Sequence, residues 1–311
     1  MTLSYSQAAM HALFVRERLH VTNAECWKRY PTVQELMKKT KEYEAEVKKL
    51  SDMCDLGTAA VGVDGICCAF DKEFPVLNYC SSEGDRPFVL LYKGDISLLE
   101  DLNKNIAVIG TLDPDSDTVE RERSIVFELV NHEMNIVSGL ANGCDSVAHQ
   151  ACMEAGGKTI AILPSQIDKL YPAKNRDLAK KIVDTGGLLL TEYAQGALSR
   201  TEALNRFPLR DRLQALFSKA VIMVASYRKG EGDSGSRHAM ESAKKYQIRR
   251  YVMFDDRKDL EKPIFGLNCD MLKNEHDVKT ICHSTIEKLA LWEDPKLAGD
   301  MKTEQIRIDV D

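Results

Sequence analysis

The chain has 311 residues, of which 44% are hydrophobic and 29% charged, a composition typical of a soluble globular protein with a sizeable core. It contains no run of about 18 apolar residues, which argues against a membrane span, and its amino-terminal stretch lacks the basic region of a secretory signal. The net charge of −6 speaks against a general nucleic-acid-binding protein. We therefore expect a cytoplasmic protein with one large domain and a smaller one beside it.

The nine cysteines are scattered along the chain and form neither a CxxC pair nor a Cys/His cluster at zinc spacing. A disulfide framework and a structural metal are therefore not expected, and reduced, mostly buried thiols are the simpler interpretation. The Walker A motif GxxxxGK[ST] is also absent. We accordingly expect no metal and no cofactor.

The first 56 residues show the apolar spacing of helices. Pro31 is placed to open one long helix through Leu50, with apolar residues on one face and lysines on the other. We favour a solvated lysine face over a small helical core; a helix that binds DNA or a partner is the alternative. Gly57, Gly62 and Gly65 then punctuate the chain, so we predict a helical N-terminal domain over residues 1–69.

From residue 70 the sequence alternates between apolar runs and segments of helical period. A strand candidate, FVLLY, comes first, and six more apolar runs follow, separated by helices of about ten residues. This alternation indicates an α/β fold with a mostly parallel, doubly wound sheet. We predict this domain over residues 70–291 and a polar, frayed tail over residues 292–311. The six runs are IAVIG (106–110), NIVSG (135–139), KTIAILP (158–164), LLLTEY (188–193), VIMVAS (221–226) and RRYVMF (249–254).

The loops after the first two of these strands carry candidate ligand-binding residues. In an open parallel sheet the carboxyl ends of the strands form the crevice that takes ligands. Gly139 and Gly143 allow a close backbone approach, and Asp145 is the predicted N-cap of the next helix, so the loop amides are placed to hold a phosphate. His149 is either a general base or, as we favour, a helix histidine hydrogen-bonded to the loop. The candidate residues of this region are Gly110, Ser138, Gly139, Asn142, Gly143 and Asp145.

A second glycine-rich loop follows the strand VIMVAS and opens another helix, as a phosphate cradle would. We do not interpret it as a dinucleotide-binding fingerprint, and a loop that only turns the chain is the alternative. Its candidate ligand-binding residues are Ser234, Gly235, Ser236 and Arg237.

The segment from Arg200 to Arg250 contains 12 Lys or Arg against 5 acidic residues, a local basic field on an acidic protein. Within it, Arg210 and Arg212 are separated by one residue, so on a helix they diverge by about 200° and cannot both serve one buried partner. They either flank a track for backbone phosphates or form structural ion pairs with Glu192 or Asp211.

Several segments, in order, resemble those of the DprA/Smf family of DNA-processing proteins. They are EFPVLN, RPFVLLYKGDISLL, IAVIGT, SGLANGCDSVAH, GGKTIAILPSQIDKLYPAKNRDL, GGLLLTEY, FPLRDR, DSGSRHAMESA and IFGLNCDML. The resemblance implies an extended Rossmann-like domain that binds single-stranded DNA and hands it to a RecA-type recombinase, and we expect a homodimer. It also adds Lys174 to the phosphate-binding candidates. The chain departs from the family pattern at Leu112, Asn142, Gln166 and Asp211.

Two hypotheses of function follow. The first is a non-enzymatic, single-stranded-DNA-binding protein in which loop amides hold phosphates and Lys174 and Arg210 add charge. The second is a small-nucleotide-binding or nucleotide-hydrolysing protein that resembles the LOG-type phosphoribohydrolases, with Glu241 as its catalytic candidate; a surface pair between Glu241 and Lys245 is the competing interpretation. A third, weaker possibility is a protein repurposed for interaction through its N-terminal helices.

Overall fold

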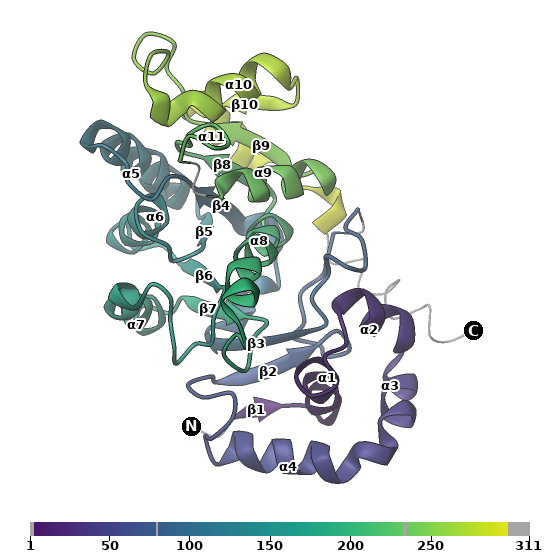
Figure 1. Cartoon of the computed structure of the whole chain (residues 1–311). Helices are drawn as coiled ribbons and strands as arrows, with labels where there is room; N and C mark the ends of the chain where they lie inside the picture. Colours follow the sequence, from purple (N-terminus) through teal and green to yellow (C-terminus); the bar gives the residue numbers. More distant parts are fainter. Residues whose placement is uncertain (1–2, 79, 233–234, 298–311) are drawn as a thin grey trace.

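The apolar runs of the sequence form the strands of one ten-stranded sheet, with the order β1-β2-β3-β7-β6-β5-β4-β8-β9-β10 (Figure 1). The computed structural model describes residues 3–78, 80–232 and 235–297. Neighbouring strands from β7 to β10 in this order are parallel, which confirms the predicted α/β, mostly parallel sheet. The bounds of these strands are β4 (Asn105–Ile109), β5 (Asn135–Ser138), β6 (Thr159–Leu163), β7 (Leu188–Thr191), β8 (Ala220–Met223), β9 (Arg249–Val252) and β10 (Val278–Thr280).

Three further strands extend the sheet beyond β7. β3 (Val89–Gly94) is antiparallel to β7 and to β2 (Gly65–Cys68), and β1 (Ser4–Tyr5) lies parallel to β2. The sheet therefore runs without interruption past residue 69, where we predicted a domain boundary.

Helices cover both faces of the sheet because the strands are apolar on both sides. Ile106 and Val108 of β4 pack with residues of α5 and α6, whereas Ala107 and Ile109 pack with residues of α8 and α9. Two buried cores result, one on each face. The covering helices are α5 (Ser116–Asn131), α6 (Cys144–Glu154), α7 (Arg176–Asp184), α8 (Arg200–Leu216), α9 (Ser236–Lys245), α10 (Gly266–Asn274) and α11 (His283–Leu291).

The N-terminal helices pack around α1 (Gln7–Glu17) and against β2 and β3 at the lower end of the molecule in Figure 1. They include α2 (Asn23–Arg29), α3 (Val33–Lys39) and α4 (Glu44–Asp55). The single long helix predicted from Pro31 to Leu50 is wrong. Thr40 ends α3, where its buried hydroxyl donates to the Leu36 carbonyl at 2.6 Å and contacts His11 Nδ1 at 2.7 Å, and the chain turns there into α4.

The first part of the predicted tail is ordered, contrary to our expectation of a frayed segment. The buried Lys219 ammonium donates to the Trp292 carbonyl at 2.8 Å, and the Arg249 guanidinium stacks 3.5 Å over the Trp292 ring. Asn103 and Asp294 exchange two hydrogen bonds further along. Residues 292–297 therefore dock on the domain, while residues 298–311 lie outside the described part. None of the described helices combines the length and the hydrophobicity that crossing a bilayer requires.

Candidate nucleic-acid interface

The carboxyl ends of β4 and β8 mark the point where the strand order reverses. From β4 the chain adds β5, β6 and β7 on one side, and from β8 it adds β9 and β10 on the other. Loops that leave such a switch point in opposite directions open a crevice between them. We call the surface formed by the loops after β4, β5, β6, β7 and β8 the carboxyl-end face.

The loop between β5 and α6 is held closed by its own acidic residue. The Asp145 carboxylate accepts hydrogen bonds from the Gly139 and Ala141 amides at 3.1 and 3.3 Å. The predicted N-cap at Asp145 is wrong, since α6 begins at Cys144 and Gly143 is its N-cap, with a φ of +70°. A side chain at Gly143 would come within 2.3 Å of the Thr111 carbonyl, so the loops after β4 and β5 touch there. Two of the amides that the sequence suggested for phosphate binding thus already have an internal acceptor.

Other candidates of these two loops have packing contacts. The buried Ser138 hydroxyl donates to the Val108 carbonyl at 2.7 Å. A Cβ at Gly110 would lie 2.6 Å from the Cys144 sulfur, so only glycine lets the end of β4 approach α6. Asn142 is partly exposed.

Arg210 lies buried beneath this loop, between two carboxylates. Its guanidinium is 3.6 Å from Asp145 and 3.0 Å from Asp211. A Cβ on Gly139 would be 1.0 Å from Arg210 Nη1, so this glycine makes room for the arginine. Gln214, with its carboxamide oxygen toward the loop, accepts from the Gly139 amide at 2.9 Å and from Arg210 at 3.1 Å.

Burial determines the protonation of this cluster. Desolvation raises the pKa of Asp211 to about 7, although the neighbouring Arg210 acts in the opposite direction. Desolvation also raises the pKa of Asp145, against the effects of Arg210 and of the loop amides. Two carboxyl groups thus compete for one buried cation, and their shared charge is sensitive to pH.

Arg212 points away from Arg210 to a separate site, as predicted for two arginines that are two residues apart on a helix. It forms a buried ion pair with Glu192 at 2.8 Å and donates from Nε to the Asp85 carbonyl at 2.9 Å. Asn23 from α2 donates to the same Glu192 at 2.8 Å, which ties the N-terminal helices to α8. Both arginines therefore form buried ion pairs with the partners that the alternative interpretation named.

The glycine-rich loop after β8 ends at Gly235, which has a φ of +87° and is the N-cap of α9. The Ser236 hydroxyl donates to the Gly110 carbonyl at 3.0 Å and thereby links this loop to the end of β4. Ser234 lies outside the described residues. Gly230, Gly232 and Gly235 have the spacing of a GxGxxG motif, but the motif starts well past the end of β8 at Met223 rather than in a tight strand-to-helix turn.

The predicted pair between Glu241 and Lys245 is wrong. The Glu241 carboxylate, on a side chain 57% exposed, pairs with Arg237 one turn earlier at 2.7 Å, and Lys245 pairs with Asp85. Arg237 thus belongs to a pair on the surface of α9. Glu241 has the surroundings of a surface residue, and no observation favours a catalytic role for it.

His149 is buried, and its Nδ1 lies 2.6 Å from the Thr159 hydroxyl on β6. Burial, helped by the positive charge of Arg210, lowers its pKa to about 3, so the imidazole is neutral. The interpretation as a helix histidine is confirmed, but its partner is a strand residue and not the loop.

Lys174 is the predicted cation that the structure leaves exposed on this face. It lies in the short helix η4 (Ala173–Asn175), and the next residue, Asn175, anchors that helix to the β5–α6 loop. The Asn175 amide donates to the carbonyls of Leu140 and Ala141 at 2.8 and 3.2 Å and contacts Ser146 Oγ at 3.1 Å. Lys174 is therefore held beside the candidate loop.

Sequence reasoning missed a cavity of about 480 Å³ between residues 164–171 and residues 196–207. Its lining includes Tyr171 and Phe207, whose rings meet edge to face with centroids 5.6 Å apart. The exposed cations Lys169 and Arg200 also line it. Both rings lie in segments that resemble the DprA/Smf family, and basic residues lie close to each of them in the sequence. Aromatic residues near basic residues are a sequence signal for a surface on which nucleic-acid bases stack.

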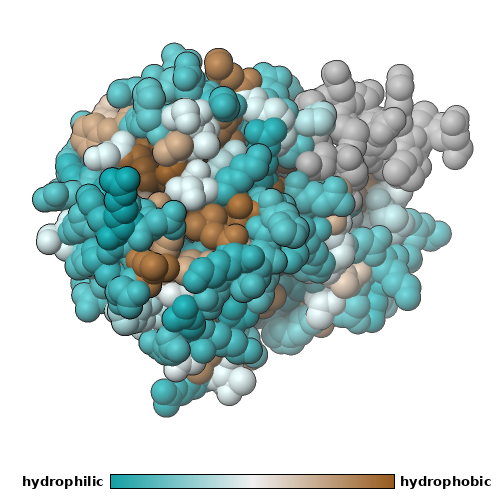
Figure 2. Space-filling view, turned by 90° about the horizontal axis from the view of Figure 1, so that it is seen from above, coloured by the Kyte–Doolittle hydropathy of each residue, from teal (hydrophilic) through white to brown (hydrophobic). Residues whose placement is uncertain are grey.

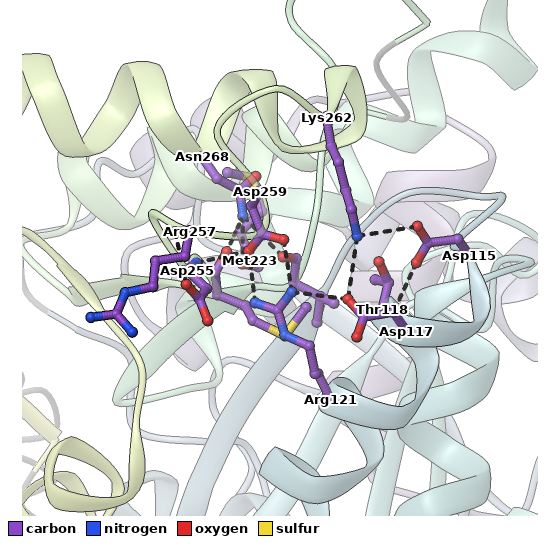
Figure 3. A network of polar contacts seen from close by, with 12 residues as sticks. Asp115, Asp117, Thr118, Arg121, Met223, Asp255, Arg257, Asp259, Lys262 and Asn268 are labelled. Carbon is purple, nitrogen blue, oxygen red and sulfur yellow. Dashed lines mark hydrogen bonds and ion pairs between the residues drawn. The ribbon is translucent and has the colours of Figure 1, made fainter.

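The far side of the face is fixed by a polar network around the start of α5 (Figure 3). The buried Asp259 receives two hydrogen bonds of 2.8 Å from Arg121, and Lys262 pairs with Asp115 and Asp117. The Asn268 amide donates to the Val224 and Met253 carbonyls, both at 2.9 Å, and so joins the ends of β8 and β9. Within residues 3–78, 80–232 and 235–297, no group of three or more His, Cys, Asp or Glu could hold a metal ion.

Comparison with known proteins places this geometry in a family. The family model for DNA recombination-mediator protein A matches residues 65–270, which is more than half of the chain and includes the whole carboxyl-end face. The chain belongs to this family. The α/β fold and the resemblance predicted from the sequence are thereby confirmed.

Individual relatives agree with this assignment. The chain is 34% identical to DNA processing protein DprA of Streptococcus pneumoniae over 163 residues, covering 50% of this chain and 55% of that protein. It is 31% identical to DprA of Bacillus subtilis over 165 residues, covering 53% and 52%. The matches cover between 34% and 55% of the full lengths of the curated relatives.

Two solved structures share the fold. The X-ray structure of DprA from Streptococcus pneumoniae superposes with a TM-score of 0.64 over 93% of each chain, at 23% identity. DprA from Helicobacter pylori, studied for its mode of binding single-stranded DNA, superposes with a TM-score of 0.59 over 70% of this chain and 92% of that one, at 26% identity.

Proposed function

We propose that this protein is a non-enzymatic DNA-processing protein that binds and protects single-stranded DNA on its carboxyl-end face. The observation behind the proposal is that exposed cations and an aromatic pair lie together on this face of a recombination-mediator fold. Lys169, Lys174 and Arg200 are exposed, and none of them forms an ion pair with another described residue. They are therefore available to phosphates in a way that the buried Arg210 and Arg212 are not.

The proposed path runs from the β5–α6 loop past Lys174 to the cavity beside Tyr171. Phosphates meet the lysines and Arg200, and the exposed ring of Tyr171, supported by Phe207, offers a surface on which a base stacks. Stacking on an aromatic ring and charge along a backbone do not read sequence, so we expect binding with little base preference. Arg210 and Gly139 shape the floor beneath this path.

We further propose that the bound strand is delivered to a RecA-type recombinase in DNA uptake or recombination, that the protein acts as a homodimer, and that it works in the cytoplasm. Membership of the DNA recombination-mediator protein A family supports the proposed delivery to a recombinase. For the dimer, Figure 2 shows hydrophobic patches within a mostly hydrophilic surface, and patches of this kind are commonly covered by association.

Fluorescence anisotropy with a labelled single-stranded oligonucleotide tests DNA binding directly. Wild-type protein is titrated at several salt concentrations, and Lys174→Glu is measured beside it. We expect affinity to fall as salt rises and Lys174→Glu to bind about tenfold or more weakly, because a phosphate contact becomes a repulsion. No binding at low salt would contradict the proposal.

Lys48→Glu is the matched control, since Lys48 is an exposed lysine on α4, away from the carboxyl-end face. It changes the net charge by the same amount and should leave the affinity within about twofold of wild type, because surface charges beyond a Debye length are screened. Equal losses in the two variants would mean that binding follows net charge and not this face.

A further inference from the structure

The buried cluster under the β5–α6 loop carries an excess of negative charge. Arg210 contributes one positive charge, and the carboxylates of Asp145 and Asp211 lie within 3.6 and 3.0 Å of it. With both acids ionised, the cluster has a net charge of −1 directly below the surface where we propose that phosphates bind. An uncompensated buried charge is poorly screened and acts over longer distances than a surface charge.

Asp211 lies between Arg210, which supports the β5–α6 loop, and Gly235 at the start of α9. Its ion-pair partner Arg210 fills the space beside Gly139, and the Asp211 Oδ2 atom lies 3.4 Å from where a Cβ on Gly235 would stand. Asp145, by contrast, accepts hydrogen bonds from two loop amides, which favour its ionised form. The Asp211 charge is therefore the one less compensated by hydrogen bonds, and it lies next to the N-terminus of α9.

We propose that Asp211 limits the affinity of the carboxyl-end face for single-stranded DNA, and that protonation of its carboxyl group strengthens binding. This inference rests on the proposed function. A phosphate held at the β5–α6 loop and an ionised Asp211 below it repel each other, so the strand binds best to the protein in which Asp211 carries a proton. The bound strand in turn favours that proton, and binding takes up protons from solution.

The pH range follows from the environment of Asp211. Burial raises its pKa to about 7, so the carboxyl group changes charge between pH 6 and 8. Several other charged or titratable groups surround Asp211. Arg210 lies beside Asp211 on α8, and α6 carries Asp145 and the neutral His149. The α9 helix carries His238 and the Arg237–Glu241 pair, and the Arg212–Glu192 pair lies beyond them. Of these, the partly exposed His238 carries an imidazole, so the experiment includes a control at this position.

The test is the affinity for a labelled single-stranded oligonucleotide at pH 6, 7 and 8 at constant salt, for wild type, Asp211→Asn, His238→Gln and Asp52→Asn. Wild type should bind on the order of tenfold more tightly at pH 6 than at pH 8, the factor that corresponds to one pKa unit of coupling. Asp211→Asn keeps the shape of the side chain without its charge. It should bind at every pH as tightly as wild type does at pH 6.

The other two variants separate this effect from general electrostatics. Asp52 is an exposed acid on α4, and Asp52→Asn should keep both the affinity and the pH dependence of wild type. His238→Gln should also keep the pH dependence. A wild-type affinity that is equal at pH 6 and 8, or a pH dependence that persists in Asp211→Asn or disappears in His238→Gln, overturns the inference while the proposed function stands. Absence of binding by all variants at every pH overturns both.

Discussion

The centre of the carboxyl-end face and its rim carry cations in opposite environments. Arg210 beneath the centre and Arg212, which points to a separate site, are 6% and 4% exposed and paired with carboxylates, whereas Lys169, Lys174 and Arg200 at the rim are exposed. A buried ion pair stabilises geometry only while both partners remain, and an exposed cation contributes little to folding but is available to a ligand. The cations near this face therefore have two roles, one structural and one in ligand binding, and the predictions below separate them.

The largest expected effect is on stability, from Arg210→Ala. This change leaves two buried carboxylates without their cation and should lower the free energy of unfolding by about 3–5 kcal/mol. Arg200→Ala is the matched control on the same helix, and because Arg200 is exposed it should cost less than about 0.5 kcal/mol. Chemical denaturation of both variants measures the difference. Equal effects would mean that the centre is not a structural cluster.

Asp211→Asn should change stability in the opposite direction and with a defined pH dependence. Because burial raises the folded-state pKa of Asp211 from 3.8 to about 7, folding is penalised increasingly as pH rises from about 4 to 7. The variant removes this penalty and should be more stable than wild type by on the order of 4 kcal/mol at pH 8, with no difference near pH 4. Denaturation curves at the two pH values test this. A variant less stable than wild type at pH 8 would contradict the account.

Asn175→Ala should have an intermediate effect, because it removes the hydrogen bonds that hold the Lys174 segment to the β5–α6 loop. Two loop carbonyls lose their donor, which should cost about 1–3 kcal/mol. Amide hydrogen exchange should become faster in residues 139–143. Asn205→Ala, an exposed asparagine on α8, serves as control and should change neither stability nor exchange there.

The smallest expected effect on stability comes from the rim. Lys174→Ala should leave the free energy of unfolding within about 0.5 kcal/mol of wild type, since the side chain is exposed and unpaired among the described residues. Thermal denaturation checks this. A loss comparable to that of Arg210→Ala would place Lys174 in the structural group.

The sequence predicted the fold better than the roles of its charged residues. The alternation of apolar runs with helical segments was enough for the parallel sheet, because period and length are local properties. The same pattern could not show that α8 begins as early as Arg200, where Ser199 caps it, because Pro208 lies inside the helix and a proline is typical of a helix start or break. Nor could it show that α3 and α4 are separate helices, which depends on the buried contact between Thr40 and His11.

Charge placement depends on contacts between segments far apart in the chain. Asp145 looked like a helix cap, but it closes its own loop and faces Arg210, which stands 65 positions later in the sequence. The aromatic pair of Tyr171 and Phe207 likewise joins two loops that no local pattern connects. Such pairings become visible only in the folded chain.

We propose that the exposed rim, and not the basic segment as a whole, supplies the positive charge that binds single-stranded DNA. The salt dependence of binding for Lys169→Ala/Lys174→Ala, compared with Lys48→Ala/Lys49→Ala on α4, tests this proposal. The slope of log K against log [salt] should fall by about 1.4 in the rim variant, because each lost phosphate contact reduces it by about 0.7 for a single strand, and should not change in the α4 variant. Equal slopes in the two variants, or a reduced slope only in the α4 variant, would contradict the account.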